Sequence, residues 1–284
     1  MKLAVLLAEA STLLAQAGIA DARLDARLLV QQFSDTTQAD AIGRPDLTLG
    51  VETLAAVRQA IARRANGEPV HRIIGFREFY GLKLFLSAAT LEPRPDTETL
   101  VDAVVPILRQ LAARSGVARL LDLGTGTGAI ALALLVQVPE ATAVGIDISA
   151  DALATAERNA RENGLSERFE AVRSDWFSEI RGAFDVIVAN PPYIRTEELK
   201  TLQREVFEHD PATALDGGAD GLVAYRTIAG QAVNHLVVGG RLAVEIGHTQ
   251  KEEVARLFEA QGWRLTEARR DLAGRDRVLV FARG

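Results

Sequence analysis

The sequence predicts an α/β protein in which a small all-α domain and a β-hairpin linker precede a mostly parallel sheet with helices on both faces. Three observations favour this class. Residues 1–73 carry apolar side chains at helical spacing. From about residue 96, short apolar runs alternate with helical patterns, as in parallel α/β folds. The first of these runs ends in a glycine-rich turn that leads into a helix, which is the usual frame of a nucleotide site.

The predicted all-α domain covers residues 1–73. Its helices are expected over Lys2–Gln16, Asp21–Phe33 and Gly50–Arg64. The first helix stops at Gly18, and the Asn66-Gly67-Glu68-Pro69 turn breaks the last one. A linker is predicted over residues 74–95, in which Phe79 to Leu86 has the pattern of a short hairpin.

The α/β domain is predicted over residues 96–284, and it begins with a helix over Leu100–Ala113. Its strands are expected over Leu120–Leu123, Val144–Asp147, Phe169–Arg173, Phe184–Ala189, Gly240–Ile246, Trp263–Ala268 and Arg277–Ala282. The last two runs are joined by the tight connector Gly274-Arg275-Asp276, which favours a hairpin. The sheet is therefore expected to end in an antiparallel strand.

Composition places few limits on function but excludes some classes. The 284 residues are 48% hydrophobic, so the chain can bury a full core. It has no cysteine, which excludes disulfides and thiolate metal sites and favours a reducing, cytoplasmic location. The apolar start Met1 to Ala8 is cut short by Glu9, so we expect a helix there and no signal peptide. No apolar stretch approaches the roughly 18 residues of a membrane span.

Charge and histidine spacing give two further expectations. The net charge is −6, and residues 1–75 hold eight basic and eight acidic residues, without the basic run typical of nucleic-acid binders. We therefore expect no direct contact with nucleic acid. No metal site and no catalytic histidine are expected either, because the four histidines lie far apart without metal-ligand spacing.

The tetrad Asn190-Pro191-Pro192-Tyr193 follows the apolar strand that ends at Ala189. It is therefore expected at the carboxyl edge of the sheet, where α/β proteins bind ligands. The Asn190 side-chain oxygen and the Pro191 carbonyl can each accept an N–H, and Tyr193 can cover a flat group. Such dipeptides also occur in ordinary turns, so the tetrad alone leaves both interpretations open.

A glycine-rich turn upstream makes the functional interpretation stronger. Gly124-Thr125-Gly126-Thr127-Gly128 joins a strand to a helix with Gly-x-Gly-x-Gly spacing. The next strand ends in Asp147, whose carboxylate can accept both ribose hydroxyls of a nucleoside. The strand after it leads to Asp175 and Trp176, which can bind an adenine amino group and stack on the ring. Suitable chemistry at successive strand ends predicts a nucleoside site.

Together, these motifs resemble the class I S-adenosylmethionine-dependent methyltransferases, in the Asn-Pro-Pro-Tyr branch that modifies planar nitrogens. Further segments narrow the resemblance to the bacterial peptide chain release factor N5-glutamine methyltransferases, and it covers essentially the whole chain. The segments are Arg23–Ala26, Pro69-Val70, Gly75–Gly81, Pro93–Glu98, Ala214–Leu222 and Tyr225-Arg226. Within the branch, Arg94-Pro95-x-Thr97-Glu98 is the most discriminating of them. The chain departs from the usual pattern at Asp96 and at His209-Asp210-Pro211.

The resemblance implies a Rossmann-like seven-stranded sheet, S-adenosylmethionine as cofactor and the glutamine of a Gly-Gly-Gln loop in class I release factors as substrate. Gly124–Gly128, Asp147, Asp175, Trp176 and Asn190 would then contact the cofactor. The tetrad would hold the substrate amide, with Asn190, Pro191 and Tyr193 in the catalytic roles. The helical domain would recognise the release factor. We expect the protein to be a monomer and not to associate with a membrane.

Other functions remain open at this point. The same tetrad serves nucleic-acid amino-methyltransferases that act on adenine N6 or guanine N2, and a ribosomal protein glutamine methyltransferase is a near relative. A cofactor-binding protein without activity is a third alternative. The absence of a basic run counts against the first, the Arg94–Glu98 segment against the second, and the intact motifs against the third.

Overall fold

The computed structural model describes residues 1–283. The chain forms two compact units. The first is helical and comprises Met1–Phe76 together with Gln203–His209, and the second contains the remainder of the described chain. Within residues 1–283, no helix has both the length and the hydropathy needed to cross a bilayer.

The first unit is all-α, as predicted. Its helices are α1 (Leu3–Gln16), α2 (Ala22–Ser34), α3 (Gln38–Gly43), α4 (Val51–Ala65), α5 (Val70–Ile74) and α9 (Arg204–His209). Buried aliphatic side chains from α1, α2 and α4 form its core, including Leu3, Leu14, Leu29 and Val57. Three short helices, α3, α5 and α9, were not expected from the sequence. The α3 helix starts at a capping box, in which Thr37 accepts from the Asp40 N–H and the Asp40 carboxylate accepts from the Thr37 N–H.

A buried ion pair crosses the core of the helical unit. Arg64 donates to Asp25 at 2.6 Å, and both side chains are 7% exposed. Arg64 also lies 2.8 Å from Glu205 of α9. Burial of an unpaired charge is costly, so the contact with Glu205 helps to hold the segment 203–209 against helices of residues 1–76, far away in the sequence.

The linker forms the predicted hairpin, shifted towards the N-terminus. Its strands are β1 (Phe76–Phe79) and β2 (Leu82–Phe85). The two residues between them, Tyr80 and Gly81, both have positive φ angles, which suits a two-residue hairpin turn.

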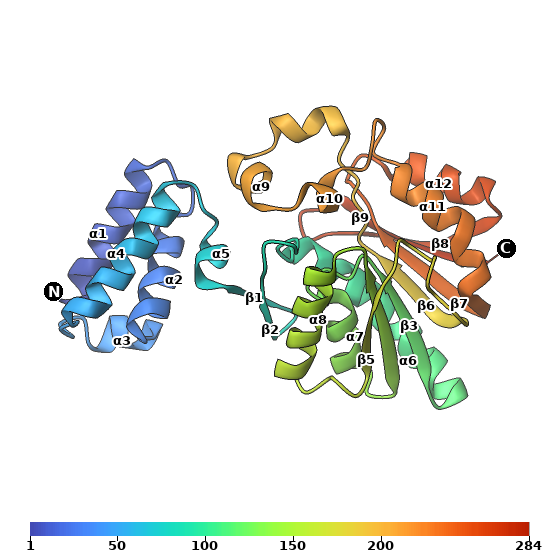
Figure 1. Ribbon diagram of the computed structural model, residues 1–284, viewed down its shortest axis with the longest axis horizontal. Coiled ribbons are helices and arrows are strands. Elements are labelled where there is room, and N and C mark those ends of the chain that lie inside the picture. The colour runs from blue at the N-terminus through green and yellow to red at the C-terminus, as the bar shows by residue number, and fades with distance from the viewer. Residues whose placement is uncertain (284) are drawn as a thin grey trace. The chain divides into compact units, whose positions relative to one another are not determined.

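The second unit contains the predicted Rossmann-like sheet of seven strands in the order β5-β4-β3-β6-β7-β9-β8 (Figure 1). The strands are β3 (Ala118–Leu123), β4 (Ala141–Asp147), β5 (Phe169–Arg173), β6 (Phe184–Ala189), β7 (Leu236–Glu245), β8 (Trp263–Arg270) and β9 (Asp276–Arg283). All neighbouring pairs are parallel except those of β9, which runs antiparallel to β7 and β8. The sheet therefore ends in an antiparallel strand, as expected: β8 forms this edge and pairs with β9, which lies inside the sheet.

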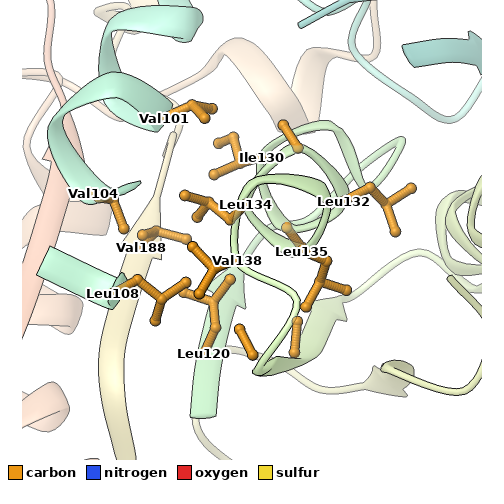
Figure 2. Packing of buried hydrophobic residues seen from close by; sticks show 14 of the residues in the cluster. Val101, Val104, Leu108, Leu120, Ile130, Leu132, Leu134, Leu135, Val138 and Val188 are labelled. Atoms are coloured by element: carbon orange, nitrogen blue, oxygen red, sulfur yellow. The ribbon is translucent and has the colours of Figure 1, made fainter. Parts of the chain in front are cut away.

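Helices cover both faces of this sheet. One face packs against α6 (Glu98–Ser115), α7 (Ala129–Gln137) and α8 (Ala150–Glu162), and the other against α11 (Val223–Gln231) and α12 (Lys251–Ala260). The α7 helix is buried over seven consecutive residues, since it lies between the sheet and its neighbouring helices. Figure 2 shows its side chains Ile130, Leu134 and Leu135 beside side chains of α6 and of two strands.

The parallel register brings four strand ends to one edge of the sheet. Leu123 of β3 pairs with Ile146 of β4 and with Ala189 of β6, and Asp147 pairs with Arg173 of β5. The segments that follow these strands therefore emerge side by side. The second unit also contains short connecting helices, namely η1 (Pro95–Thr97), η2 (Thr196–Thr201), α10 (Ala212–Leu215) and η3 (Ala232–His235). The last of these directly precedes β7.

Candidate active site

A cavity of about 530 Å³ opens at this edge of the sheet. Its volume lies in the range typical of small-molecule sites. The cavity wall includes most of the predicted site residues: Gly124, Thr125, Gly126, Thr127, Asp147, Asp175, Trp176, Asn190, Pro191 and Pro192. Gly128 and Tyr193 do not line it. Neighbours of these residues complete much of the wall, and two further segments contribute whose role the sequence did not indicate in detail, residues 89–97 and residues 212–216.

The glycine-rich turn is held by backbone hydrogen bonds and closes around Thr125. The Thr125 N–H donates to the Ile146 carbonyl at 2.8 Å, and the Gly128 N–H donates to the Thr125 carbonyl at 2.8 Å. Gly126 has a φ of 54°, in the left-handed region that favours glycine. At Gly124 and Gly126, therefore, the turn presents backbone without a side chain to this part of the cavity.

Asp147 is fixed at the end of β4 by two backbone donors. Its Oδ2 accepts from the Gly126 N–H at 3.0 Å, and its Oδ1 accepts from the Ser149 N–H at 2.9 Å. Each carboxylate oxygen keeps a free lone pair, and the residue lines the cavity. This carboxylate is thus oriented to accept a pair of neighbouring hydroxyls, which is what a ribose presents.

Asp122, in β3 just before the turn, was not assigned a role from the sequence. It is completely buried, and its Oδ2 accepts from the Thr125 hydroxyl at 2.7 Å. Its Oδ1 has no hydrogen-bond partner among the described residues. Burial raises the pKa of this carboxyl to about 6, and the Thr125 hydrogen bond acts in the opposite direction.

Asp175 and Trp176 form the next part of the wall, after β5. The backbone there is bent, since Trp176 has a φ of 51° and its carbonyl accepts from the Ser174 hydroxyl at 2.6 Å. The Trp176 ring is half-buried, and the Asp175 side chain is exposed. Both line the cavity, so the arrangement suits an aromatic ring held against Trp176 with Asp175 at its edge.

Asn190 contacts a residue that lies 93 positions earlier in the chain. Its side-chain nitrogen donates to the Thr97 hydroxyl at 3.2 Å, and both residues line the cavity. Glu245, at the end of β7, lies beside Asn190 because the preceding residues Val244 and Ala189 pair in the sheet; it is 2% exposed and outside the cavity wall. Burial raises the pKa of Glu245 to about 7, while hydrogen bonds to Thr97 and Asn190 and the positive charge of Arg277 act in the opposite direction. Glu245 and Thr97 were not assigned roles from the sequence.

Hydrogen bonds from the segment 215–221 and from Gln250 hold the tetrad loop in place. The Gly217 N–H donates to the Ile194 carbonyl at 2.8 Å, and the Ile194 N–H donates to the Leu215 carbonyl at 3.0 Å. Gln250 donates to the Tyr193 carbonyl at 3.0 Å and accepts from the Gly247 N–H at 3.1 Å. The loop geometry thus depends on residues that no local pattern around the tetrad could identify.

The Tyr193 ring packs against the hydrophobic cluster on the α11 and α12 face of the sheet. Burial raises the pKa of its hydroxyl to about 12, so this group is neutral in the physiological range. The structure does not place the ring in the cavity wall, and its expected role of covering the substrate amide stays a prediction.

The two departures from the expected sequence pattern both form ion pairs. Asp96 accepts from Arg277 at 3.1 Å, and Asp210 accepts from Arg94 at 2.6 Å. The second pair ties Arg94 of the cavity wall to a residue just before the wall segment 212–216. At both of these positions, therefore, the aspartate has an arginine partner.

The chemistry of the wall is that of binding and alignment. Its residues include no histidine, lysine or cysteine, so no nucleophile or general base of those types faces the cavity. Within the described chain, no group of three histidine, cysteine, aspartate or glutamate residues is suited to a metal ion. The site offers carbonyl, amide and carboxylate oxygens as acceptors, which suits a substrate that presents N–H groups.

Comparison with known proteins gives matches along nearly the whole chain. Residues 5–75 match the family model described as PrmC N-terminal domain, and residues 100–239 match the Methyltransferase small domain. A release factor glutamine methyltransferase of Agrobacterium fabrum is 52% identical over 94% of this chain and 92% of its own length. Another, from Rhodospirillum rubrum, is 43% identical over 94% of this chain and 81% of its own length.

Solved structures share the fold at much lower identity. A methyltransferase from Pyrococcus furiosus has a TM-score of 0.54 and 18% identity, over 80% of this chain and 98% of its own. The hMettl16 catalytic domain has a TM-score of 0.58 and 15% identity, over 79% of this chain and 82% of its own. These two likenesses concern the fold alone.

Proposed function

The chain belongs to the release factor glutamine methyltransferase family, and we propose that it methylates the side-chain amide nitrogen (N5) of the glutamine in the Gly-Gly-Gln loop of class I peptide chain release factors. The methyl donor is S-adenosylmethionine. One observation of the site carries the proposal. The Asn190 nitrogen is engaged by Thr97, so its oxygen is the end available to accept an N–H in the cavity.

The residues present suit S-adenosylmethionine. Asp147, with both oxygens oriented by backbone donors, would accept the two ribose hydroxyls. Trp176 and Asp175 would receive the adenine, and the turn could approach the remainder of the molecule closely at Gly124 and Gly126, which have no side chain. The bound sulfonium supplies an activated methyl group.

The protein's contribution to the reaction is to hold an unreactive nitrogen in place. The lone pair of an amide nitrogen is delocalised into its carbonyl, so an amide is a poor nucleophile. The Asn190 oxygen and the Pro191 carbonyl would each accept one N–H of the substrate amide and fix its orientation. Both acceptors also stabilise the positive charge that develops on this nitrogen during transfer.

No general base is required before transfer in this scheme. The nitrogen becomes more acidic once it carries the methyl group, and the extra proton can then leave to solvent. The wall fits such a scheme, because it contains no histidine or lysine. Prolines 191 and 192 limit the motion of the loop, which lowers the cost of alignment.

The helical unit supplies the second part of the proposal. We infer that residues 1–73 contact the body of the release factor, that residues 74–95 act as a linker and that residues 96–284 hold the catalytic site. The match of residues 5–75 to the PrmC N-terminal domain supports this division. The balanced charge of residues 1–75 supports a protein partner in place of nucleic acid. A monomer in the cytoplasm, where release factors act, completes the proposal.

The test is mass spectrometry of purified substrates after incubation with this protein and S-adenosylmethionine. We expect a mass increase of one methyl group on the glutamine of the Gly-Gly-Gln loop of a release factor. Ribosomal proteins and RNA serve as parallel substrates. Methylation of either of these, with the release factor unmodified, would contradict the proposal.

A further inference from the structure

The Asn190 side chain has two chemically different ends, and only one of them suits the proposed reaction. Its oxygen accepts an N–H, whereas its nitrogen only donates. A substrate amide that presents its N–H groups would be repelled by the nitrogen end. The catalytic use of Asn190 therefore depends on whatever decides which end faces the cavity.

We propose that Glu245 is a positioning residue that acts through Asn190, by fixing the orientation of the Asn190 amide together with Thr97. This inference rests on the proposed function. Thr97 and Asn190 line the cavity, whereas Glu245 lies behind them and does not. Glu245 therefore influences the substrate only through these two side chains.

Hydrogen-bond chemistry explains why a carboxylate at this position selects one orientation. Above its raised pKa of about 7, Glu245 is an ionised carboxylate, which only accepts, so it attracts the N–H end of Asn190 and repels the oxygen end. The Thr97 hydroxyl accepts from the Asn190 nitrogen at 3.2 Å and keeps its own proton to donate. Ala189 of β6 pairs with Val244 of β7, so the residues that follow them, Asn190 and Glu245, lie side by side at the sheet edge. The Asn190 N–H thus has an acceptor in Thr97, and the unpartnered Glu245 oxygen is available to accept from these side chains.

A purely structural role as partner of Arg277 does not account for Glu245. The Arg277 guanidinium donates through Nη2 to Asp271 at 3.0 Å and to Asp96 at 3.1 Å. Its Nη1 donates to the Ile246 carbonyl at 3.4 Å. Glu245 takes none of these donors, and its own Oε2 is buried without a hydrogen-bond partner among the described residues. The carboxyl is therefore held at a cost in stability, and its benefit lies at Asn190.

The isosteric variant Glu245→Gln distinguishes positioning from packing. It keeps the size of the side chain but introduces an NH₂ group behind Asn190. Asn190 can then turn its oxygen towards that group and its nitrogen towards the cavity. We expect the single-turnover rate of glutamine methylation to fall about 10- to 100-fold, with the affinity for S-adenosylmethionine changed less than twofold.

A double-mutant cycle with Asn190→Ala tests whether the effect passes through Asn190. Glu245→Gln should lower the rate in the wild-type background and have little further effect once Asn190 is alanine. Thr97→Val should behave like Glu245→Gln, and Thr97→Ser should retain most of the activity. Thr155→Val is the matched control, since Thr155 is also buried but donates to the Asp151 carbonyl on α8. Equal fractional losses from Glu245→Gln in both backgrounds would overturn the proposal.

A spectroscopic measurement keeps the test independent of activity. The side-chain NH₂ resonances of Asn190, assigned by their loss in Asn190→Ala, should shift strongly in Glu245→Gln and stay in place in Thr155→Val. Unchanged resonances in Glu245→Gln would refute the positioning role, even in a preparation without methyltransferase activity. A different outcome would refute the proposed function alone: the wild-type protein fails to methylate the release factor, yet the Asn190 resonances differ between wild type and Glu245→Gln as expected.

Discussion

At the scale of single residues, Asp147 has the clearest predicted role in cofactor binding. Asp147→Ala removes a charged acceptor whose two oxygens are already oriented by Gly126 and Ser149. Hydrogen bonds to charged groups contribute about 1.5–3 kcal/mol each, so we expect S-adenosylmethionine binding to weaken at least about tenfold. Isothermal titration calorimetry measures this directly, and unchanged affinity would contradict the ribose assignment.

Asn190 has a different expected signature. Asn190→Ala removes one acceptor for the substrate amide, and loss of one preorganised hydrogen bond costs about 10²–10³ in rate in other enzymes. Cofactor affinity should stay nearly unchanged, because the proposed ribose and adenine contacts come from Asp147, Asp175 and Trp176. Asn190→Asp should be impaired less, since it keeps an oxygen acceptor but adds a charge. Single-turnover methylation near the wild-type rate in Asn190→Ala would rule out the amide clamp.

Glu245 also gives a stability prediction with a defined sign. Burial raises its pKa from an ordinary value of 4.5 to about 7, so the folded protein binds this proton more tightly than the unfolded chain. The free energy of unfolding therefore falls as pH rises from about 4.5 to about 7, by on the order of 3 kcal/mol from this group. The ionisable groups that face it are Asp96, whose charge raises its pKa, and Arg277, whose charge lowers it.

Urea denaturation at pH 5 and pH 8 tests that sign. Wild-type protein should lose more stability between the two values than Glu245→Gln, which cannot ionise. Asp122, with a pKa raised to about 6, acts in the same direction in both proteins and cancels in the comparison. An equal pH dependence in the two proteins would show that Glu245 does not change its charge in this range.

At the scale of elements, the tetrad loop depends on close backbone packing at Gly217. A Cβ atom there would lie 2.8 Å from the Tyr193 Cα and 2.9 Å from the Pro192 carbonyl oxygen. Because these contacts are with backbone, Gly217→Ala must displace the loop. We expect a loss of about 10²-fold in the methylation rate, with cofactor binding retained. Gly230→Ala in α11 is the control, since nothing lies within 4 Å of its Cβ.

The elements that the sequence predicted share a local signal. β3, β6 and the helix after the glycine turn follow from runs of apolar residues that are buried in the core. The helices α3 and α5 were missed because they have six and five residues, too few for an apolar periodicity. A capping pattern from Thr37 to Asp40 was the available signal for α3.

The candidate site was predictable where a motif follows a strand, as at Gly124–Thr127, Asp147 and Asn190. The positions of Thr97, Glu245 and Gln250 beside the tetrad could not be predicted from the sequence, because each comes from a distant segment, although Thr97 belongs to the segment that narrowed the family resemblance. Thr97 lies 93 residues from Asn190, and Gln250 lies 57 residues from Tyr193. Spacing in one sequence contains no record of such pairs. For the same reason, the grouping of Gln203–His209 with the helical unit could not be foreseen.

At the scale of the whole molecule, chemistry and recognition are assigned to different units. The residues proposed for cofactor and amide binding all belong to the sheet unit. The helical unit has its own apolar core and a buried ion pair between Asp25 and Arg64. A change in the core of the helical unit should therefore affect recognition of a whole release factor without affecting the methyl transfer step itself.

Leu29→Ala tests this separation. Leu29 is completely buried in α2, and loss of a core leucine costs about 2–5 kcal/mol, which loosens the helical unit. We expect the KM for intact release factor to rise at least about tenfold. Cofactor affinity and the rate with a short Gly-Gly-Gln peptide should stay within twofold of wild type, because the peptide reaches only the cavity. Leu272→Ala, at a fully exposed position, is the control. If Leu29→Ala slows the peptide as much as the whole factor, the helical unit supports the catalytic site and is not specific for recognition of the factor.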